Sequence, residues 1–176
     1  WVLIVVMFLS SLHFGLIFST FTRKANNMFR SEVVRTYVAI IVAASLFIAA
    51  SLYFTGIYTD ISESLQQSVF QVVSLITTTG FATADTNTWT PFAIVILIIL
   101  SIICGCAGST SGGAKVDRVL LYFKVLVARL RGQQHPNAII RVRLDGILQE
   151  ERQVNAVTLF LTTYFVLILV GTLSSA

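Results

Sequence analysis

The chain reads Ser74-Leu-Ile-Thr-Thr-Thr-Gly-Phe-Ala-Thr-Ala-Asp85 near its middle, a polar turn that contains a single glycine. A short segment with apolar residues at helical spacing precedes this turn, and a long apolar run beginning at Pro91 follows it. Backbone that is not helical is tolerated at membrane depth only where protein or a water-filled cavity satisfies its polar groups. This order of segments is therefore typical of a pore loop, which enters a membrane and turns back.

The composition favours a membrane protein. Hydrophobic residues make up 56% of the 176 residues and charged residues 11%, with a mean hydropathy of +0.85. A soluble domain carries about one-quarter charged residues. Four apolar stretches have the character of membrane spans, over residues 1–21, 37–54, 91–107 and 154–173. Residue 1 is a Trp within an apolar run and no signal peptide is recognisable, so we expect a fragment of a longer protein.

A fifth segment, residues 64–76, is too short to span. Apolar residues recur in it at helical spacing: Leu65, Val69, Val72, Val73 and Ile76. A polar side is formed by Gln66, Gln67, Gln71 and Ser74. A helix of this length reaches about 20 Å, whereas the hydrocarbon core is about 30 Å thick. The sequence predicts a re-entrant helix, with Ser64 and Gln67 as a capping box at its start.

The charges predict the orientation. All 12 basic residues lie between the first and second spans or between the third and fourth: Arg23, Lys24, Arg30, Arg35, Lys115, Arg118, Lys124, Arg129, Arg131, Arg141, Arg143 and Arg152. The loop of residues 55–90 has three acidic residues and no basic one. Because basic loops remain in the cytoplasm, the pore turn should face outward. This distribution also explains the net charge of +4 without a nucleic-acid partner.

The turn has the chemistry of a cation filter. A monovalent cation that leaves water loses its hydration shell, and backbone carbonyl groups can replace those oxygens. The candidate ligands are the carbonyls of Thr78, Thr79, Gly80 and Phe81. We expect Gly80 at positive φ, which only glycine adopts cheaply. The negative end of the preceding helix would add attraction for a cation. The alternative is an ordinary helix with a glycine cap.

A second glycine-rich segment follows the third span. Its residues of interest are Gly105, Gly108, Ser109, Thr110, Ser111, Gly112 and Gly113. Broken helices with glycine and small polar residues line the pathways of membrane transporters, so we interpret this segment as a mobile gate below the filter. A plain helix end with a cytoplasmic turn is the alternative. An amphipathic helix over residues 116–131 and a short strand over residues 139–144 are expected after it.

The remaining reactive side chains favour no enzyme. Cys104 and Cys106 are too few for a metal site and too close for a disulfide, and we expect them to be packing residues. His13 and His135 have no matching partners in the sequence and are expected to be structural or solvated. A membrane enzyme or sensor that uses a hydroxyl of residues 109–111 would need a positioned base, and none can be placed.

Three segments together resemble the pore subunit of the Trk/Ktr/HKT superfamily of potassium transporters, as in the bacterial Trk systems: residues 70–85, residues 105–113 and His135-Pro-Asn-Ala138. Members fold four linked repeats of span, pore helix and span around one pore. The resemblance implies an all-α membrane protein, with one re-entrant pore loop in this fragment. It assigns residues 1–36 to the second span of a preceding repeat and its cytoplasmic loop, 37–131 to a complete repeat, 132–153 to a cytoplasmic linker, and 154–176 to the first span of the next repeat.

The resemblance also implies potassium uptake by a multi-pass protein of the cell (inner) membrane. Potassium would be the transported ion at residues 78–81, residues 105–113 would be the gate, and no cofactor is implied. The implied partners are a second full-length subunit in a homodimer, a cytoplasmic nucleotide-binding regulatory subunit and the lipid bilayer. The filter reads Thr-Thr-Gly-Phe-Ala where tetrameric potassium channels carry Thr-Val-Gly-Tyr-Gly, so a cation channel with weaker selectivity for potassium over sodium stays open as an alternative.

Overall fold

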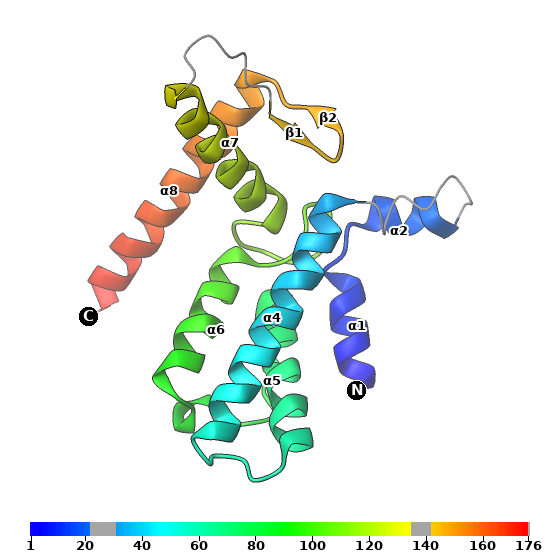
Figure 1. Cartoon of the computed structure of the whole chain (residues 1–176), viewed down its shortest axis with the longest axis vertical. Coiled ribbons are helices and arrows are strands. Elements are labelled where there is room, and N and C mark those ends of the chain that lie inside the picture. The colour runs from blue at the N-terminus through cyan, green and yellow to red at the C-terminus, as the bar shows by residue number, and fades with distance from the viewer. Residues whose placement is uncertain (22–30, 135–141, 176) are drawn as a thin grey trace. The chain divides into compact units, whose positions relative to one another are not determined.

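The computed structural model describes residues 1–21, 31–134 and 142–175 (Figure 1). The chain divides into two compact units, Trp1–Val116 and Asp117–Ala176. The first contains α1 (Val2–Ser10), α2 (Phe14–Phe21), α4 (Glu32–Phe54), α5 (Ile61–Ile76), the short 3-10 helix η1 (Thr86–Thr88) and α6 (Pro91–Ile103). The second contains α7 (Val116–Gln134), whose first residue closes the first unit, then β1 (Arg143–Leu144), β2 (Ile147–Leu148) and α8 (Glu151–Ser175). The prediction of a helical protein is confirmed, with one small hairpin in addition.

Two helices are long and apolar enough to cross a membrane. They are α4, with 23 residues, and α8, with 25 residues, and each has a mean hydropathy of 2.2. At 1.5 Å per residue they reach about 34 Å and 37 Å, which exceeds the hydrocarbon core. The start of α4 was predicted at residue 37, but its N-cap is Ser31, whose hydroxyl accepts a hydrogen bond from the Val34 N–H. The helix therefore begins with a more polar turn, residues 32–36, which precedes the predicted apolar run of residues 37–54.

The first predicted span is not one helix. Residues 1–21 form α1 and α2, separated by a break at residues 11–13. The Ser10 and Ser11 hydroxyls donate to the carbonyls of Met7 and Phe8, at 2.8 and 2.7 Å. Such bonds offer the backbone an alternative to continued helix. The apolar composition therefore predicted the extent of the segment, but it could not show the interruption.

Helix α5 packs closely against α4. Asp60 is its N-cap and accepts a hydrogen bond from the Ser62 N–H at 3.0 Å, so the helix starts three residues before the predicted one. The predicted capping box is wrong, because Ser64 is fully buried and donates to the Ala49 carbonyl of α4 at 2.9 Å. Small hydroxyl residues let two membrane helices approach and bond to each other. The helix has 16 residues, about 24 Å, and remains too short to span.

Helix α6 completes the first unit and returns beside α4 and α5 (Figure 1). Thr90 is its N-cap and Pro91 occupies the first turn, where a missing N–H costs nothing. The hydroxyls of Thr90 and Ser51 are hydrogen-bonded at 2.8 Å and join α6 to the end of α4. The helix ends at Ile103, four residues before the predicted end, because Cys104 has a φ of 63° that no helix continues through.

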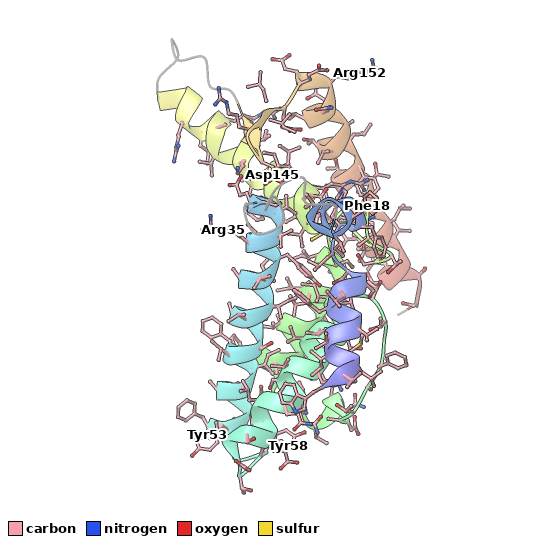
Figure 2. The ribbon with its side chains drawn as sticks, turned by 90° about the vertical axis from the view of Figure 1, so that its right-hand side faces the viewer. Phe18, Arg35, Tyr53, Tyr58, Asp145 and Arg152 are labelled. Atoms are coloured by element: carbon pink, nitrogen blue, oxygen red, sulfur yellow. The ribbon has the colours of Figure 1, made fainter. Side chains whose placement is uncertain are left out.

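The two ends of the first unit differ in chemistry. Figure 2 shows Phe18 and Arg35 at one end of this unit, and Tyr53 and Tyr58 at the opposite end of α4. Tyr and Trp are enriched at membrane interfaces, and Arg is enriched on the cytoplasmic side. Arg35 and the two tyrosines therefore lie at opposite ends of this unit, and the orientation in the membrane stays a prediction from the charges.

The second unit joins an amphipathic helix to a spanning helix. Helix α7 begins at the predicted residue and runs three residues beyond the predicted end. The predicted strand is described only from residue 142, and the break predicted at Pro136 and Asn137 lies outside the described residues. Strand β1 pairs antiparallel with β2 through Asp145 and Gly146, which both have positive φ as a two-residue hairpin turn requires. The Arg118 guanidinium lies 4.2 Å from the centre of the Phe160 ring on α8.

Candidate functional site

Helix α5 ends in a turn that reverses the chain. Its C-cap is Thr77. The Thr78 N–H donates to the Leu75 carbonyl at 3.1 Å, and the Thr79 N–H donates to the Ser74 carbonyl at 3.0 Å. These two bonds form a Schellman motif, in which the residue after the C-cap must be left-handed. That residue is Thr78, with a φ of 58°.

The left-handed Thr78 shows that Gly80 does not cap the helix. The glycine-cap alternative is therefore wrong, since the capping position is two residues earlier. Gly80 nonetheless has a positive φ of 74°, as predicted from its place in the turn. A Cβ at Gly80 would meet nothing within 4 Å, so the backbone angle and not the space requires glycine. A β-branched residue such as Thr78 in this region costs about 1–3 kcal/mol.

The polar side of α5 holds the segment that follows the turn. The Ser74 hydroxyl donates to the Phe81 carbonyl at 2.6 Å, and the Gln71 amide donates to the Ala84 carbonyl at 3.2 Å. One turn earlier, the Gln67 side chain accepts a hydrogen bond from the Thr83 hydroxyl at 2.6 Å. Positions 67, 71 and 74 share one face of a helix. The predicted polar side therefore positions residues 81–84 along α5.

The candidate filter residues differ in whether their carbonyl oxygens accept a hydrogen bond. Thr78, Thr79, Gly80 and Phe81 are all exposed. Within the described residues, no hydrogen bond ends on the carbonyl oxygen of Thr78, Thr79 or Gly80. The Phe81 carbonyl is already held by Ser74. Three consecutive carbonyls thus remain available at the end of α5, where the helix dipole adds partial negative charge. In the same described part of the chain, no group of three His, Cys, Asp or Glu residues could hold a metal.

The glycine-rich segment is a compact loop between α6 and α7. The Ala114 N–H donates to the Ile102 carbonyl at 3.1 Å, and the Val116 N–H donates to the Gly105 carbonyl at 3.0 Å. These bonds bring the two ends of the loop together. Within it, the Ser109 hydroxyl is bonded to the Cys106 carbonyl and to the Ser111 hydroxyl, at 2.5 and 2.7 Å.

Close packing explains two of the loop glycines. A Cβ on Gly105 would collide with the Ser111 hydroxyl, and one on Gly113 would collide with the Cys104 sulfur. Gly113 also has a φ of +72°. Cys104 and Cys106 are free and about 1% exposed, so their prediction as packing residues is confirmed. At Gly105 and Gly113 a side chain could not fit, so close packing by itself requires glycine at these two positions.

The break between α1 and α2 provides hydrogen bonds for the loop. The Cys106 N–H donates to the Ser11 carbonyl at 3.1 Å. The Thr110 N–H and hydroxyl both donate to the Ser10 carbonyl, at 3.4 and 3.1 Å. These carbonyls are accessible because the helix stops there. Sequence reasoning missed this contact, although adjacent serines followed by a glycine within an apolar run were a signal for it.

Two further side chains complete the packing at the break. The imidazole of His13 packs against Gly108, since a Cβ on Gly108 would lie about 3 Å from the ring. His13 thus has the structural role that was one of its two predicted roles. His135 lies outside the described residues. The Ser11 hydroxyl is 2.5 Å from the hydroxyl of Tyr37, which is fully buried in α4 and stacks on Phe8. The loop, the break and α4 therefore form one connected structure.

The loop also touches the candidate filter. The Gly112 N–H donates to the Thr78 hydroxyl at 3.1 Å. The structure thus brings together the two segments that the sequence singled out, residues 78–81 and 105–113.

Comparison with known proteins identifies the arrangement. A model of the TrkH family, described as "Cation transport protein", matches residues 1–175. The chain belongs to the TrkH family. The expected resemblance to Trk-type transporters is therefore confirmed, and the family is one of membrane transport proteins and not of enzymes.

Relatives within the TrkH family cover nearly the whole chain. The Trk system potassium uptake protein TrkH of Salmonella typhimurium is 33% identical over 174 residues, which is 98% of this chain and 36% of the relative. The Trk system potassium uptake protein TrkG of Escherichia coli is 31% identical over 171 residues, which is 93% of this chain and 35% of the relative. The chain therefore spans about 36% of the length of the curated relatives it matches.

The fold agrees with a solved member of the TrkH family. The crystal structure of the potassium transporter TrkH from Vibrio parahaemolyticus superposes with a TM-score of 0.90 at 32% identity. The superposition covers 97% of this chain and 37% of that one. The helices α4 and α8 are consequently membrane helices of a TrkH-type fold, and the predicted location in the membrane is confirmed.

Proposed function

We propose that the full-length protein takes up potassium, and that residues 78–81 form one of several segments lining its selectivity filter. Positive φ at Thr78 and Gly80, with Thr79 between them outside that region, is the observation that supports this proposal. Residues at positive φ turn their neighbouring peptide groups out of the helical direction, so that the carbonyl groups of residues 78–80 are not used by the hydrogen bonds of α5. Oxygens without internal partners can then replace the water around a cation. Potassium is favoured because relatives are named potassium uptake proteins.

The four predicted ligands would contribute unequally. Thr78, Thr79 and Gly80 offer carbonyls that accept no hydrogen bond within the described residues. Phe81 would end the filter, with its carbonyl held by Ser74. The loop with Gly105, Gly108, Ser109, Thr110, Ser111, Gly112 and Gly113 would be the gate, since it follows the end of α6 and reaches Thr78. A cation channel with weaker selectivity for potassium over sodium is the second candidate, because Ala82 stands where potassium channels carry a second filter glycine.

The assembly is part of the proposal. The chain would contribute the end of one repeat (1–36), a complete repeat (37–131), a cytoplasmic linker (132–153) and the start of another repeat (154–176). Two full-length subunits would form a homodimer in the lipid bilayer, controlled by a cytoplasmic nucleotide-binding protein. In support, α8 exposes apolar side chains around its circumference, among them Leu159, Phe160 and Phe165. Such a helix needs lipid or further helices around it.

A matched pair of glycines tests the filter. Gly80 and Gly56 have φ of +74° and +72°, and a Cβ on either would meet nothing within 4 Å. Alanine at either position therefore brings a similar backbone strain, of about 1–2 kcal/mol. In full-length protein expressed in cells lacking other potassium uptake, Gly80→Ala should lower rubidium uptake at least about tenfold, and Gly56→Ala should leave it near the wild-type rate. Equal uptake by the two variants would contradict the filter assignment.

A further inference from the structure

Thr78 combines strain with an unusual use of its side chain. The helix end requires a left-handed residue at this position, and glycine would adopt that conformation more cheaply. The chain instead carries a β-branched residue there. A strained conformation persists only where other interactions compensate for its cost, and here the side chain can make such an interaction.

The hydroxyl of Thr78 provides that reason. Its oxygen accepts the hydrogen bond from the Gly112 N–H, at 3.1 Å. In the described part of the chain, this is the one hydrogen bond that joins residues 78–85 to the loop of residues 104–115. A glycine at position 78 would relieve the strain and lose the bond.

Gly112 is suited to be the moving partner. A Cβ there would meet nothing within 4 Å, and its φ lies outside the left-handed region. Gly105 and Gly113, by contrast, are packed against Ser111 and Cys104. Residue 112 can therefore leave Thr78 without disrupting the packed part of the loop.

We infer that Thr78 couples the filter to the loop, because a cation at the end of the filter nearest α5 and the Gly112 N–H compete for one hydroxyl oxygen. This inference rests on the proposed function. The hydrogen of an N–H carries partial positive charge and is repelled by a cation at the same oxygen. Ion entry weakens the bond that holds residue 112, and departure of residue 112 frees the oxygen for the ion. The loop thus responds to the occupancy of the filter.

Rubidium uptake by the full-length protein tests the coupling through two pairs of variants. Gly112→Pro removes the N–H, and Gly112→Ala keeps it. Thr78→Val removes the hydroxyl, and Thr78→Ser keeps it. We expect Gly112→Pro to raise uptake roughly two- to tenfold over Gly112→Ala, which corresponds to the loss of one hydrogen bond in the closed state. With valine at position 78, the difference between proline and alanine at position 112 should disappear.

The outcomes separate the coupling from the proposed function. The coupling would be overturned if Gly112→Pro did not raise rubidium uptake over Gly112→Ala when residue 78 is threonine. It would also be overturned if the rise were equally large when residue 78 is valine. If cells that express the wild-type full-length protein took up no more rubidium than cells that lack it, the proposed function would instead be overturned.

Hydrogen exchange of the wild-type protein gives a test that needs no variant. In purified full-length protein, the amide of Gly112 should exchange at least roughly twofold faster in potassium than in a large organic cation that cannot enter the filter. The amides of Ala114 and Val116, which are bonded to α6 and to Gly105, should not change. Equal exchange of Gly112 in the two salts would overturn the coupling.

Discussion

The backbone N–H of Phe14 donates a hydrogen bond to the carbonyl oxygen of Gly108 at 3.2 Å, which joins the first residue of α2 to the glycine-rich loop. Phe14 is at a helix start, where the N–H has no partner within its own helix. The broken first span and the loop after α6 therefore satisfy each other's backbone groups. Neither segment could adopt its conformation alone without leaving polar groups unpaired.

The buried hydroxyl of Tyr37 should stabilise this junction. Tyr37→Phe removes the bond to Ser11 and leaves the stacking on Phe8 in place. The full-length protein in detergent should lose about 1 kcal/mol of stability, measured by thermal unfolding. Tyr53→Phe is the control, because Tyr53 is 41% exposed. Equal loss in both variants would show that the Ser11 contact contributes nothing.

The glycines at positions 112 and 113 should respond differently to alanine. Gly113→Ala places a methyl group against the Cys104 sulfur at a positive φ, whereas the position at Gly112 is open. We expect Gly113→Ala to destabilise the protein by at least about 2 kcal/mol and Gly112→Ala by less than about 0.5 kcal/mol. Thermal unfolding of the two variants side by side measures the difference. A loop that is flexible throughout would tolerate both.

Ser74 should contribute to ion selectivity. Ser74→Ala removes the hydrogen bond to the Phe81 carbonyl and loosens the outer end of the proposed filter. The loss of about 1 kcal/mol should raise sodium inhibition of rubidium uptake roughly fivefold and leave the amount of protein in the membrane unchanged. Ser62→Ala, on an exposed position of the same helix, is the control. An unchanged order of ion preference would show that this tether does not shape the filter.

The orientation can be tested with thiol labelling. A cysteine at Thr59 or Asn87 should react with a membrane-impermeant reagent added outside intact cells, and a cysteine at Arg129 should react only after lysis. All three positions are exposed, and the native Cys104 and Cys106 are buried. The opposite pattern of labelling would reverse the predicted topology.

The sequence alone predicted the features that depend on local pattern. The spanning helices α4 and α8, the existence of a short helix before the turn and the start of α7 follow from hydropathy and helical periodicity, which act over neighbouring residues. The other two predicted spans are shorter in the structure, since residues 1–21 form two helices and α6 has 13 residues. The polar side of α5 and the positive φ of Gly80 were also predictable, because spacing and the lack of a Cβ are properties of single segments. The three-residue error at the start of α5 arose because Ser64 matched a capping pattern, while its hydroxyl faces α4.

Only the tertiary structure decided which segments satisfy each other. The bonds from the loop to Ser10 and Ser11 at the helix break, and the bond from Gly112 to Thr78, join residues far apart in the chain. The close fit of Gly113 against Cys104 depends on how the loop folds back on itself. Hydropathy cannot show such contacts, because a serine or glycine in an apolar run is compatible with a continuous helix until another segment offers its backbone a partner. The left-handed conformation of Thr78 is the clearest case. A threonine rarely adopts the left-handed conformation, but the turn after α5 requires it and the hydrogen bond to Gly112 stabilises it.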